Sequence, residues 1–250
     1  MSQLDSNNYF GDLGKAETLQ NPSLFPVREN PTPLINSIER ELLPNLQLSS
    51  IEPYNPVVVH RVLEPWQLLG TGNYAAVFYH PDYSHLVVKV YAPGRPGWSE
   101  EVEVYRRLGS HPAFSTCLYA ADNFLVLRRL YGTTLYDAMH RGSKISRQVI
   151  EDIDLALEYA RSRNLFPHDV HGRNVMMSED KGLVVDISDF LREEPCRAWT
   201  DLKKAYYWLY IPLFSWHRLP LPYFMLDLVR TIYRFWRNLW RILKIERRSL

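Results

Sequence analysis

The chain has 250 residues and is 46% hydrophobic, which suffices for one domain of moderate size with a real core. Its formal net charge is +1, but residues 211–250 hold eight Lys or Arg against two acidic residues, so positive charge collects at the C-terminal end. No basic footprint for nucleic acid therefore covers the protein as a whole. Because the only cysteines are Cys117 and Cys196, the composition also excludes a disulfide framework and a cysteine zinc site.

The sequence shows no signal for export or for membrane insertion. Its first residues lack the basic start and apolar stretch of a secretory signal. The longest uncharged run, from Ala205 to His217, is shorter than the roughly 18 apolar residues of a membrane span and is interrupted by Pro212. We therefore expect a cytoplasmic protein without a transmembrane helix.

The chain order predicts an arm, a domain and a C-terminal helix. Residues 1–55 mix Asn, Ser and Pro with scattered apolar residues and show no sustained periodicity, which predicts a mostly irregular arm. Within this arm, Ile38 to Leu48 is compatible with a short helix or with packing onto the domain. The folded domain is predicted over residues 56–225 and a basic amphipathic helix over residues 226–250.

The predicted domain has a β-rich half followed by an α-rich half. Short strand-like runs separated by glycine and proline turns predict an antiparallel sheet. The elements of this half are strands at Gln67 to Leu69, Ala76 to Tyr79 and Leu86 to Tyr91, a helix at Ser99 to Leu108, and strands at Cys117 to Ala120 and Phe124 to Leu127. Helical periodicity then runs from Gly132 through Arg163, so the expected fold class is α+β.

A glycine-containing segment, Gly70-Thr-Gly72-Asn-Tyr-Ala-Ala-Val77, joins the first two of these strands. A strand follows it, not a helix, so it differs from a dinucleotide-binding loop. Its small residues would let the backbone close over phosphates while Val77 covers a flat base. A glycine hairpin without a ligand would have the same sequence features.

One lysine, Lys89, lies in the otherwise apolar strand Val-Val-Lys-Val. Such a lysine either is a solvated edge residue or has a carboxylate or phosphate partner. Glu101 can supply the carboxylate because it lies on the apolar face of the following helix. Glu100 and Glu103 are the alternatives.

A polar loop between apolar strands carries the most informative pattern. It reads Phe166-Pro-His-Asp169-Val-His171-Gly-Arg-Asn174, and a later strand ends at Asp186. Asp169, Asn174 and Asp186 can converge on one point as a base for an acceptor hydroxyl and two oxygen ligands for a magnesium ion that bridges nucleotide phosphates. Capping and turn roles would explain any one of these residues but not their order.

The order of glycine loop, strand lysine, helix glutamate, Asp-x-x-x-x-Asn loop and strand-end aspartate, over residues 66–205, resembles the protein-kinase-like superfamily. This resemblance implies a bilobal protein-kinase-like fold with an antiparallel β-rich N-lobe and a shortened α-helical C-lobe. It also implies ATP, with Mg²⁺ or Mn²⁺, as the cofactors.

The resemblance further implies a role for each motif residue. Lys89 would hold the α- and β-phosphates, and Glu101 would hold Lys89. Asp169 would orient and deprotonate the acceptor hydroxyl, while Asn174 and Asp186 would bind the metal ion.

The resemblance places the remaining nucleotide contacts in the β-rich half. Gly70, Gly72 and Val77 would cover the nucleotide, and backbone groups from Leu127 to Leu130 would contact adenine. A helix residue, Asp201, looks like the buried aspartate that braces the catalytic loop.

Several positions depart from the protein-kinase pattern. His168 precedes Asp169 where many protein kinases carry arginine, so a pocket for an activation-loop phosphate is not expected. His171 stands where lysine is usual, and this Asp-x-His-x-x-Asn form is similar to antibiotic and choline phosphotransferases and to small atypical bacterial protein kinases. We count His171 among the catalytic residues. Asp186 lacks a following Phe-Gly, and Asp189 is the alternative, but the apolar strand before Asp186 favours the former.

The sequence therefore predicts an ATP-dependent phosphotransferase that acts on a hydroxyl acceptor, foremost as an atypical serine/threonine protein kinase. A small-molecule or lipid kinase is one alternative, and a nucleotide-binding pseudokinase scaffold is another. The expected partners are ATP and a protein or small-molecule hydroxyl acceptor, and no nucleic acid is expected.

The C-terminal helix has an apolar and a basic face. Its apolar face comprises Val229, Ile232, Tyr233, Trp236, Leu239, Trp240 and Leu243, and its basic stripe comprises Arg230, Arg234, Arg237, Arg241 and Lys244. The apolar face either packs on the α-rich lobe or lies on an anionic membrane surface, which would place the protein peripherally at the membrane.

Overall fold

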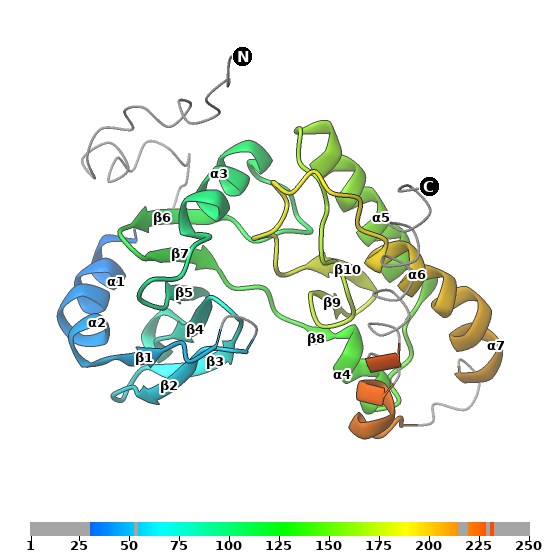
Figure 1. Cartoon of the computed structure of the whole chain (residues 1–250), viewed down its shortest axis with the longest axis horizontal. Coiled ribbons are helices and arrows are strands. Elements are labelled where there is room, and N and C mark those ends of the chain that lie inside the picture. The colour runs from blue at the N-terminus through cyan, green and yellow to red at the C-terminus, as the bar shows by residue number, and fades with distance from the viewer. Residues whose placement is uncertain (1–30, 53–54, 215–219, 229–230, 233–250) are drawn as a thin grey trace, which may run out of the picture. The chain divides into compact units, whose positions relative to one another are not determined.

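The computed structural model describes residues 31–52, 55–214, 220–228 and 231–232, and it divides the chain into two compact units (Figure 1). The first unit comprises residues 1–130, 163–165 and 187–191. The second comprises residues 131–162, 166–186 and 192–250. The first unit contains a five-stranded and a two-stranded sheet, and the second contains a three-stranded sheet.

A five-stranded antiparallel sheet, in the order β3-β4-β5-β7-β6, forms the first unit. Its strands are β3 (Gln67–Thr71), β4 (Ala75–Tyr79), β5 (Leu86–Tyr91), β6 (Cys117–Ala121) and β7 (Phe124–Arg128). A 3₁₀ turn, η4 (Pro81–Tyr83), joins β4 to β5, and α3 (Trp98–Leu108) joins β5 to β6. A two-stranded sheet of β1 (Gln47–Ser49) and β2 (Val58–Arg61) precedes them.

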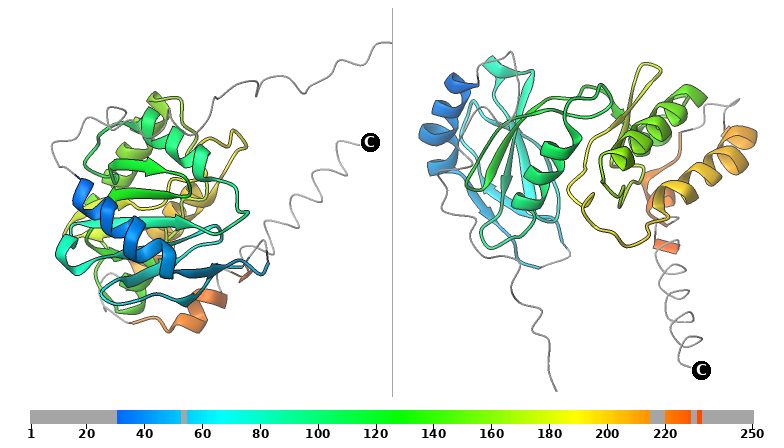
Figure 2. Two further views of the ribbon diagram at one scale, coloured as in Figure 1. Left: turned by 90° about the vertical axis from the view of Figure 1, so that its left-hand side faces the viewer. Right: turned by 90° about the horizontal axis from the view of Figure 1, so that it is seen from above.

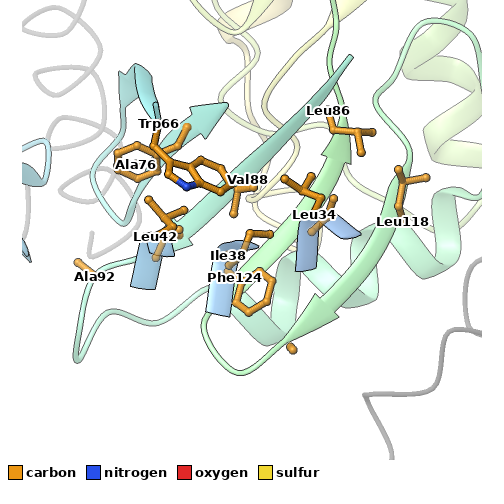
Figure 3. Packing of buried hydrophobic residues seen from close by; sticks show 14 of the residues in the cluster. Leu34, Ile38, Leu42, Trp66, Ala76, Leu86, Val88, Ala92, Leu118 and Phe124 are labelled. Carbon is orange, nitrogen blue, oxygen red and sulfur yellow. The ribbon is translucent and has the colours of Figure 1, made fainter. Parts of the chain in front are cut away.

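Alternation along β5 directs its side chains to two faces of the sheet. Val88 is fully buried in a hydrophobic cluster with Ile38, Leu42 and Phe124 (Figure 3). Lys89, one residue further, pairs instead with Glu101 of α3. The N-terminal helical segment and α3 therefore cover opposite faces of this sheet (Figure 2).

The N-terminal helical segment differs from the mostly irregular arm that the sequence predicts for residues 1–55. It consists of α1 (Thr32–Ser37), a π-helical turn η3 (Ile38–Leu42) and α2 (Leu43–Asn45). Leu34, Ile38 and Leu42 recur every four residues, so they share one helix face, and that face is buried on the sheet. Its apolar spacing is the signal for this segment. Residues 1–30 lie outside the described part.

The second unit is mainly helical. Its helical elements are α4 (Leu135–His140), α5 (Arg147–Ser162), α6 (Ala198–Ala205), the π-helical η5 (Tyr206–Tyr210), α7 (Ile211–Phe214) and a helical segment at residues 223–228. A small antiparallel sheet, in the order β10-β9-β8, joins β8 (Thr133–Thr134), β9 (Val175–Ser178) and β10 (Lys181–Val184). The helical periodicity predicted from Gly132 to Arg163 is thus divided between α4 and α5 by a turn at Gly142, whose φ is 65°.

The 16-residue helix α5 packs its apolar face against β10 at very close range. A Cβ atom on Gly182 would lie 2.3 Å from the carbonyl oxygen of Val149 and 2.8 Å from the Ile153 side chain. Only glycine fits there, so this residue sets how closely the β9–β10 hairpin approaches α5. Asn174 directly precedes this hairpin in the chain, and Asp186 follows it.

The α+β class predicted from the sequence is confirmed, with an antiparallel β-rich first unit and a mainly helical second unit. None of the helices in the described ranges has both the length and the apolar character needed to cross a membrane. Of the helix predicted over residues 226–250, residues 226–228 and 231–232 are described and are helical. The rest of that prediction lies outside the described residues.

Candidate active site

In the first unit, Lys89 of β5 forms an ion pair with Glu101 of α3. The Lys89 Nζ and Glu101 Oε2 atoms are 2.6 Å apart, and the two side chains are 14% and 1% exposed. The alternatives, Glu100 and Glu103, have other partners, because Ser99 Oγ donates to Glu100 and both Arg106 and Arg107 bind Glu103. The hydrogen bond from Arg106, aided by Arg107, lowers the pKa of Glu103 to about 2.

Tyr91 is a third member of this site that the sequence analysis missed. Its hydroxyl donates to the same Glu101 oxygen, and the Lys89 ammonium lies 5.7 Å from the centroid of its ring. A buried carboxylate needs such additional donors to offset the loss of water. The signal was available, since Tyr91 stands two residues after Lys89 and therefore points to the same face of β5.

The strand register places two more of the predicted residues on the face that carries Lys89. Val77 of β4 is directly opposite Lys89 in the antiparallel ladder. Leu127 of β7 pairs with Val87, two residues before Lys89, so it also belongs to this face. Leu127 is buried and Val77 is half-buried.

The glycine segment forms the β3–β4 hairpin. The Gly72 N–H donates to the Ala75 carbonyl at 2.8 Å, and Gly70 pairs with Val77 beside an irregularity in the ladder. A Cβ atom on Gly70 would meet nothing within 4 Å, and one on Gly72 would lie 3.7 Å from the Ala75 oxygen. The fold of the chain therefore does not itself demand glycine at either position.

Arg128, the last residue of β7, and Arg129, which follows it, form backbone hydrogen bonds within the chain. The Arg128 N–H donates to the Thr116 carbonyl at 2.9 Å, and its carbonyl accepts from Ser115 Oγ at 2.6 Å. The Arg129 N–H donates to the His85 carbonyl at 2.8 Å. Within the predicted adenine-binding stretch, no hydrogen bond of the described residues uses the backbone of Leu130, which is half-buried.

In the second unit, Asp169 occupies an unusual backbone conformation. Its φ is 53°, which few residues other than glycine adopt. The amide nitrogen of Asn174 donates to the Asp169 carbonyl at 3.1 Å, and the Asp169 N–H donates to Cys196 Sγ at 3.3 Å. These two bonds hold the peptide groups of Asp169 in place while its carboxylate remains 46% exposed.

The orientation of His171 follows from its hydrogen bonds. Its Nδ1 atom accepts from the Arg173 N–H at 3.3 Å, so the neutral ring carries its proton on Nε2. That Nε2 atom lies 3.6 Å from Asp169 Oδ2, beyond hydrogen-bond range but close enough for electrostatic attraction. The structure thus brings His171 beside the carboxylate of Asp169.

Asn174 and Asp186 lie at the same end of the β9–β10 hairpin. Val175 pairs with Val184, and the Val185 N–H donates to the Asn174 carbonyl at 3.0 Å, so Asp186 follows directly. Because the Asn174 amide nitrogen is bound to Asp169, its amide oxygen is the atom available for a cation. A carboxylate and an amide oxygen suit Mg²⁺, which takes its other ligands from water and phosphate.

Acidic and imidazole side chains do not form a complete metal site by themselves. Among the described residues, no group of three or more His, Cys, Asp and Glu side chains could hold a metal ion. Asn174 and Asp186 together offer fewer oxygen ligands than Mg²⁺ takes, so water or phosphate would have to supply the others.

The alternative strand-end residue, Asp189, belongs to the first unit and precedes a buried anchor. Phe190 is fully buried and packs edge-to-face on Phe114, with ring centroids 6.4 Å apart. Asp186 belongs instead to the unit that contains Asn174.

Helix α6 lies beside the loop that contains Asp169 and Asn174. A Cβ atom on Gly172 would lie 3.6 Å from the Leu202 side chain, and Asp201 stands in the first turn of α6. Asp201 is half-buried, where the sequence predicted a buried side chain. Cys196, just before α6, accepts a hydrogen bond from the Asp169 N–H, and no sequence signal pointed to that residue.

The chain is similar to two known proteins that are named as kinases. The chain is 29% identical over 175 residues to "Putative serine/threonine-protein kinase YrzF" of Bacillus subtilis, a match that covers 68% of this chain and 80% of YrzF. A mutant kinase domain of PknI from Mycobacterium tuberculosis is 20% identical to the chain, with a TM-score of 0.40. The match covers 60% of this chain and 63% of the PknI chain, which is less than two thirds of its length. No protein-family model matches the chain. The similarity to YrzF agrees with the order of the motif residues, which resembles that of the protein-kinase-like superfamily.

Proposed function

We propose that the chain transfers the γ-phosphoryl group of ATP to a hydroxyl group, and that this acceptor is a serine or threonine side chain of a protein. The observation that carries the proposal is the ion pair of Lys89 and Glu101, which lies on the same sheet face as Val77 and Leu127. A half-buried ammonium held by a buried carboxylate beside apolar side chains suits nucleotide phosphates next to a flat base.

Each half of the motif set has a distinct task in this proposal. Lys89 binds the α- and β-phosphates, and Glu101 with Tyr91 keeps its side chain extended toward them. Val77 and Leu127 contact the base, and the backbone of Leu130 provides its hydrogen bonds. The last assignment follows because Arg128 already uses both of its backbone groups within the chain.

The second unit provides the residues for chemistry. Asp169 accepts the proton of the acceptor hydroxyl as that oxygen bonds to the γ-phosphorus and the bond to the β-phosphate oxygen breaks. His171 orients the Asp169 carboxylate from 3.6 Å. Asn174 and Asp186 hold a Mg²⁺ or Mn²⁺ ion, which neutralises charge on the phosphates when bound.

Incubation with labelled ATP and magnesium tests the proposal directly. We expect label on serine or threonine of general protein acceptors, or on the chain itself. Lys89→Ala should abolish most of this transfer because the phosphates lose their cation in the strand. Asp180→Ala is the control, because Asp180 is an exposed residue at the far end of the β9–β10 hairpin.

Two results would contradict the proposal. Turnover in Lys89→Ala equal to that of the parent would remove the kinase assignment. Transfer to hydroxylated metabolites or lipids but not to protein would replace the acceptor by a small molecule, an outcome that agrees with the Asp-x-His-x-x-Asn form of the loop.

A further inference from the structure

Arg173 links the catalytic loop to the C-terminal part of the second unit. It lies between Gly172 and Asn174 in the chain, and its guanidinium lies 4.1 Å from the centroid of the Tyr136 ring. The same guanidinium donates from Nη2 to Asp227 Oδ1 at 2.9 Å. Tyr136 Oη donates to that same oxygen at 2.8 Å. Side chains from the loop, from α4 and from the helical segment 223–228 therefore meet at one carboxylate.

The backbone of the loop is also tied to this meeting point. The Tyr136 N–H donates to the Gly172 carbonyl at 2.9 Å. The Arg173 N–H donates to His171 Nδ1, and the next residue, Asn174, donates its N–H to the His171 carbonyl at 2.8 Å. A displacement of Arg173 would therefore move both His171 and Asn174.

The segment that carries Asp227 has separate attachments to α4. The Leu221 N–H donates to the Met139 carbonyl at 3.1 Å, and His140 Nδ1 lies 3.0 Å from the Leu221 carbonyl. The Tyr223 ring stacks on His140 with centroids 3.5 Å apart. Because these contacts hold the segment without Asp227, the carboxylate can be changed while the segment stays attached.

The ion pair itself is too exposed to account for folding stability. Arg173 and Asp227 are 43% and 50% exposed and border an open pocket of about 350 Å³. Exposed ion pairs contribute little to the free energy of unfolding. The same ion pair can still affect the catalytic rate, because small displacements of side chains next to reacting groups reduce that rate strongly.

We propose that Asp227 is a positioning residue for the catalytic loop. It holds the Arg173 guanidinium against the Tyr136 ring, and Arg173 in turn fixes the loop backbone at His171 and Asn174. The proposal rests on the function proposed above, because the loop needs a fixed geometry only if Asp169 and Asn174 take part in phosphoryl transfer.

Hydrogen exchange tests the mechanical part without any nucleotide. In Asp227→Ala, amides of residues 169–174 should exchange at least severalfold faster than in the parent, with α5 unchanged. The matched control is Asp180→Ala, which removes an exposed aspartate from the turn between β9 and β10. This turn lies at the end of the hairpin away from residues 169–174, so the change should leave the loop unaffected. Equal loop exchange in Asp227→Ala and the control would overturn the proposal.

Kinetics test the functional part. Asp227→Ala should lower kcat by roughly tenfold while KM for ATP stays nearly constant, because the nucleotide contacts of Lys89 are intact. Arg173→Ala should have a similar effect, and the double variant should be no worse than either single one, as expected for residues that act as a unit.

Two further comparisons separate the possible results. Additive losses in the double variant would show that Asp227 does not act through Arg173 and would overturn the proposal. Asp227→Asn keeps an oxygen acceptor and should recover part of the rate, which a simple folding defect in Asp227→Ala would not predict. If the parent itself transfers no phosphate, the proposed function fails, while loop exchange still decides whether Asp227 positions the loop.

Discussion

The ammonium of Lys89 and the carboxylate of Glu101 are 2.6 Å apart, although their residues lie on different secondary-structure elements, β5 and α3. With Glu101 only 1% exposed, neither charge could be left there alone without a large desolvation cost. The helix and the strand are thus joined by a pair whose energetics can be measured independently of any activity.

Lys89→Met should therefore destabilise the first unit. The change keeps an unbranched side chain but removes the cation that pairs with the buried Glu101 carboxylate, while Tyr91 still donates to it. Loss of one partner of a buried pair costs about 3–5 kcal/mol. Urea denaturation of the variant and the parent measures this difference.

The double variant Lys89→Met with Glu101→Gln supplies the control for that experiment. Because it removes both charges, it should recover much of the lost free energy of unfolding. Lys144→Met, at an exposed position, should change stability by less than about 0.5 kcal/mol. A double variant as unstable as the single one would show that lost packing, not an unpaired charge, is the cause.

Gly182→Ala should destabilise the second unit, since the new methyl group would lie 2.3 Å from the Val149 carbonyl oxygen. Either α5 or the hairpin must shift, and overpacking of this kind costs about 1–3 kcal/mol. Thermal unfolding monitored by circular dichroism checks it. Gly70→Ala is the matched control, because its Cβ would meet nothing within 4 Å, and an equal loss in both variants would contradict the packing argument.

Local sequence patterns predicted the elements of the β-rich unit well. The strand at Leu86 to Tyr91 and the helix ending at Leu108 agree with β5 and α3, because alternation and helical spacing reflect which side is buried. For the N-terminal segment, the sequence left Ile38 to Leu48 open between a short helix and packing onto the domain. The spacing of Leu34, Ile38 and Leu42 fits one helix face, but the surface that covers this face becomes known only with the sheet.

Contacts between distant residues were the part that the sequence could not provide. Tyr91 could have been placed beside Lys89 from the strand period alone. By contrast, Cys196 contacts Asp169, and Asp227 contacts Arg173, across 27 and 54 residues respectively. No local period links such positions, since their proximity depends on how the helices of the second unit pack.

Most of the apolar face predicted for residues 229–243 lies outside the described residues, and Ile232, a described member of it, is exposed. We expect this face to pack on protein, so Trp236→Ala should lower stability by about 3–5 kcal/mol. A thermal melt compares the variant with the parent. Overlaying melts, together with salt-sensitive binding to anionic liposomes that is lost when Arg230, Arg234, Arg237 and Arg241 are neutralised, would instead establish a membrane-bound helix.

Activity should depend on a divalent cation. Asn174 and Asp186 offer too few oxygen atoms to bind Mg²⁺ tightly without phosphate and water, so excess chelator should abolish transfer and Mg²⁺ or Mn²⁺ should restore it. Asp186→Asn should raise the Mg²⁺ concentration needed for half-maximal rate. Full activity in chelator would rule out this metal site.

Asp169→Asn should remove the general base and little else. The backbone of this residue is held by Asn174 and Cys196 and not by its own carboxylate, so the loop should keep its shape after the substitution. Asparagine also tolerates the positive φ of 53° that this position requires. We therefore expect turnover to fall by about 10²- to 10⁴-fold while nucleotide binding, measured by calorimetry, persists. Parallel loss of binding and turnover would show that Asp169 supports the fold of the loop instead of accepting the proton.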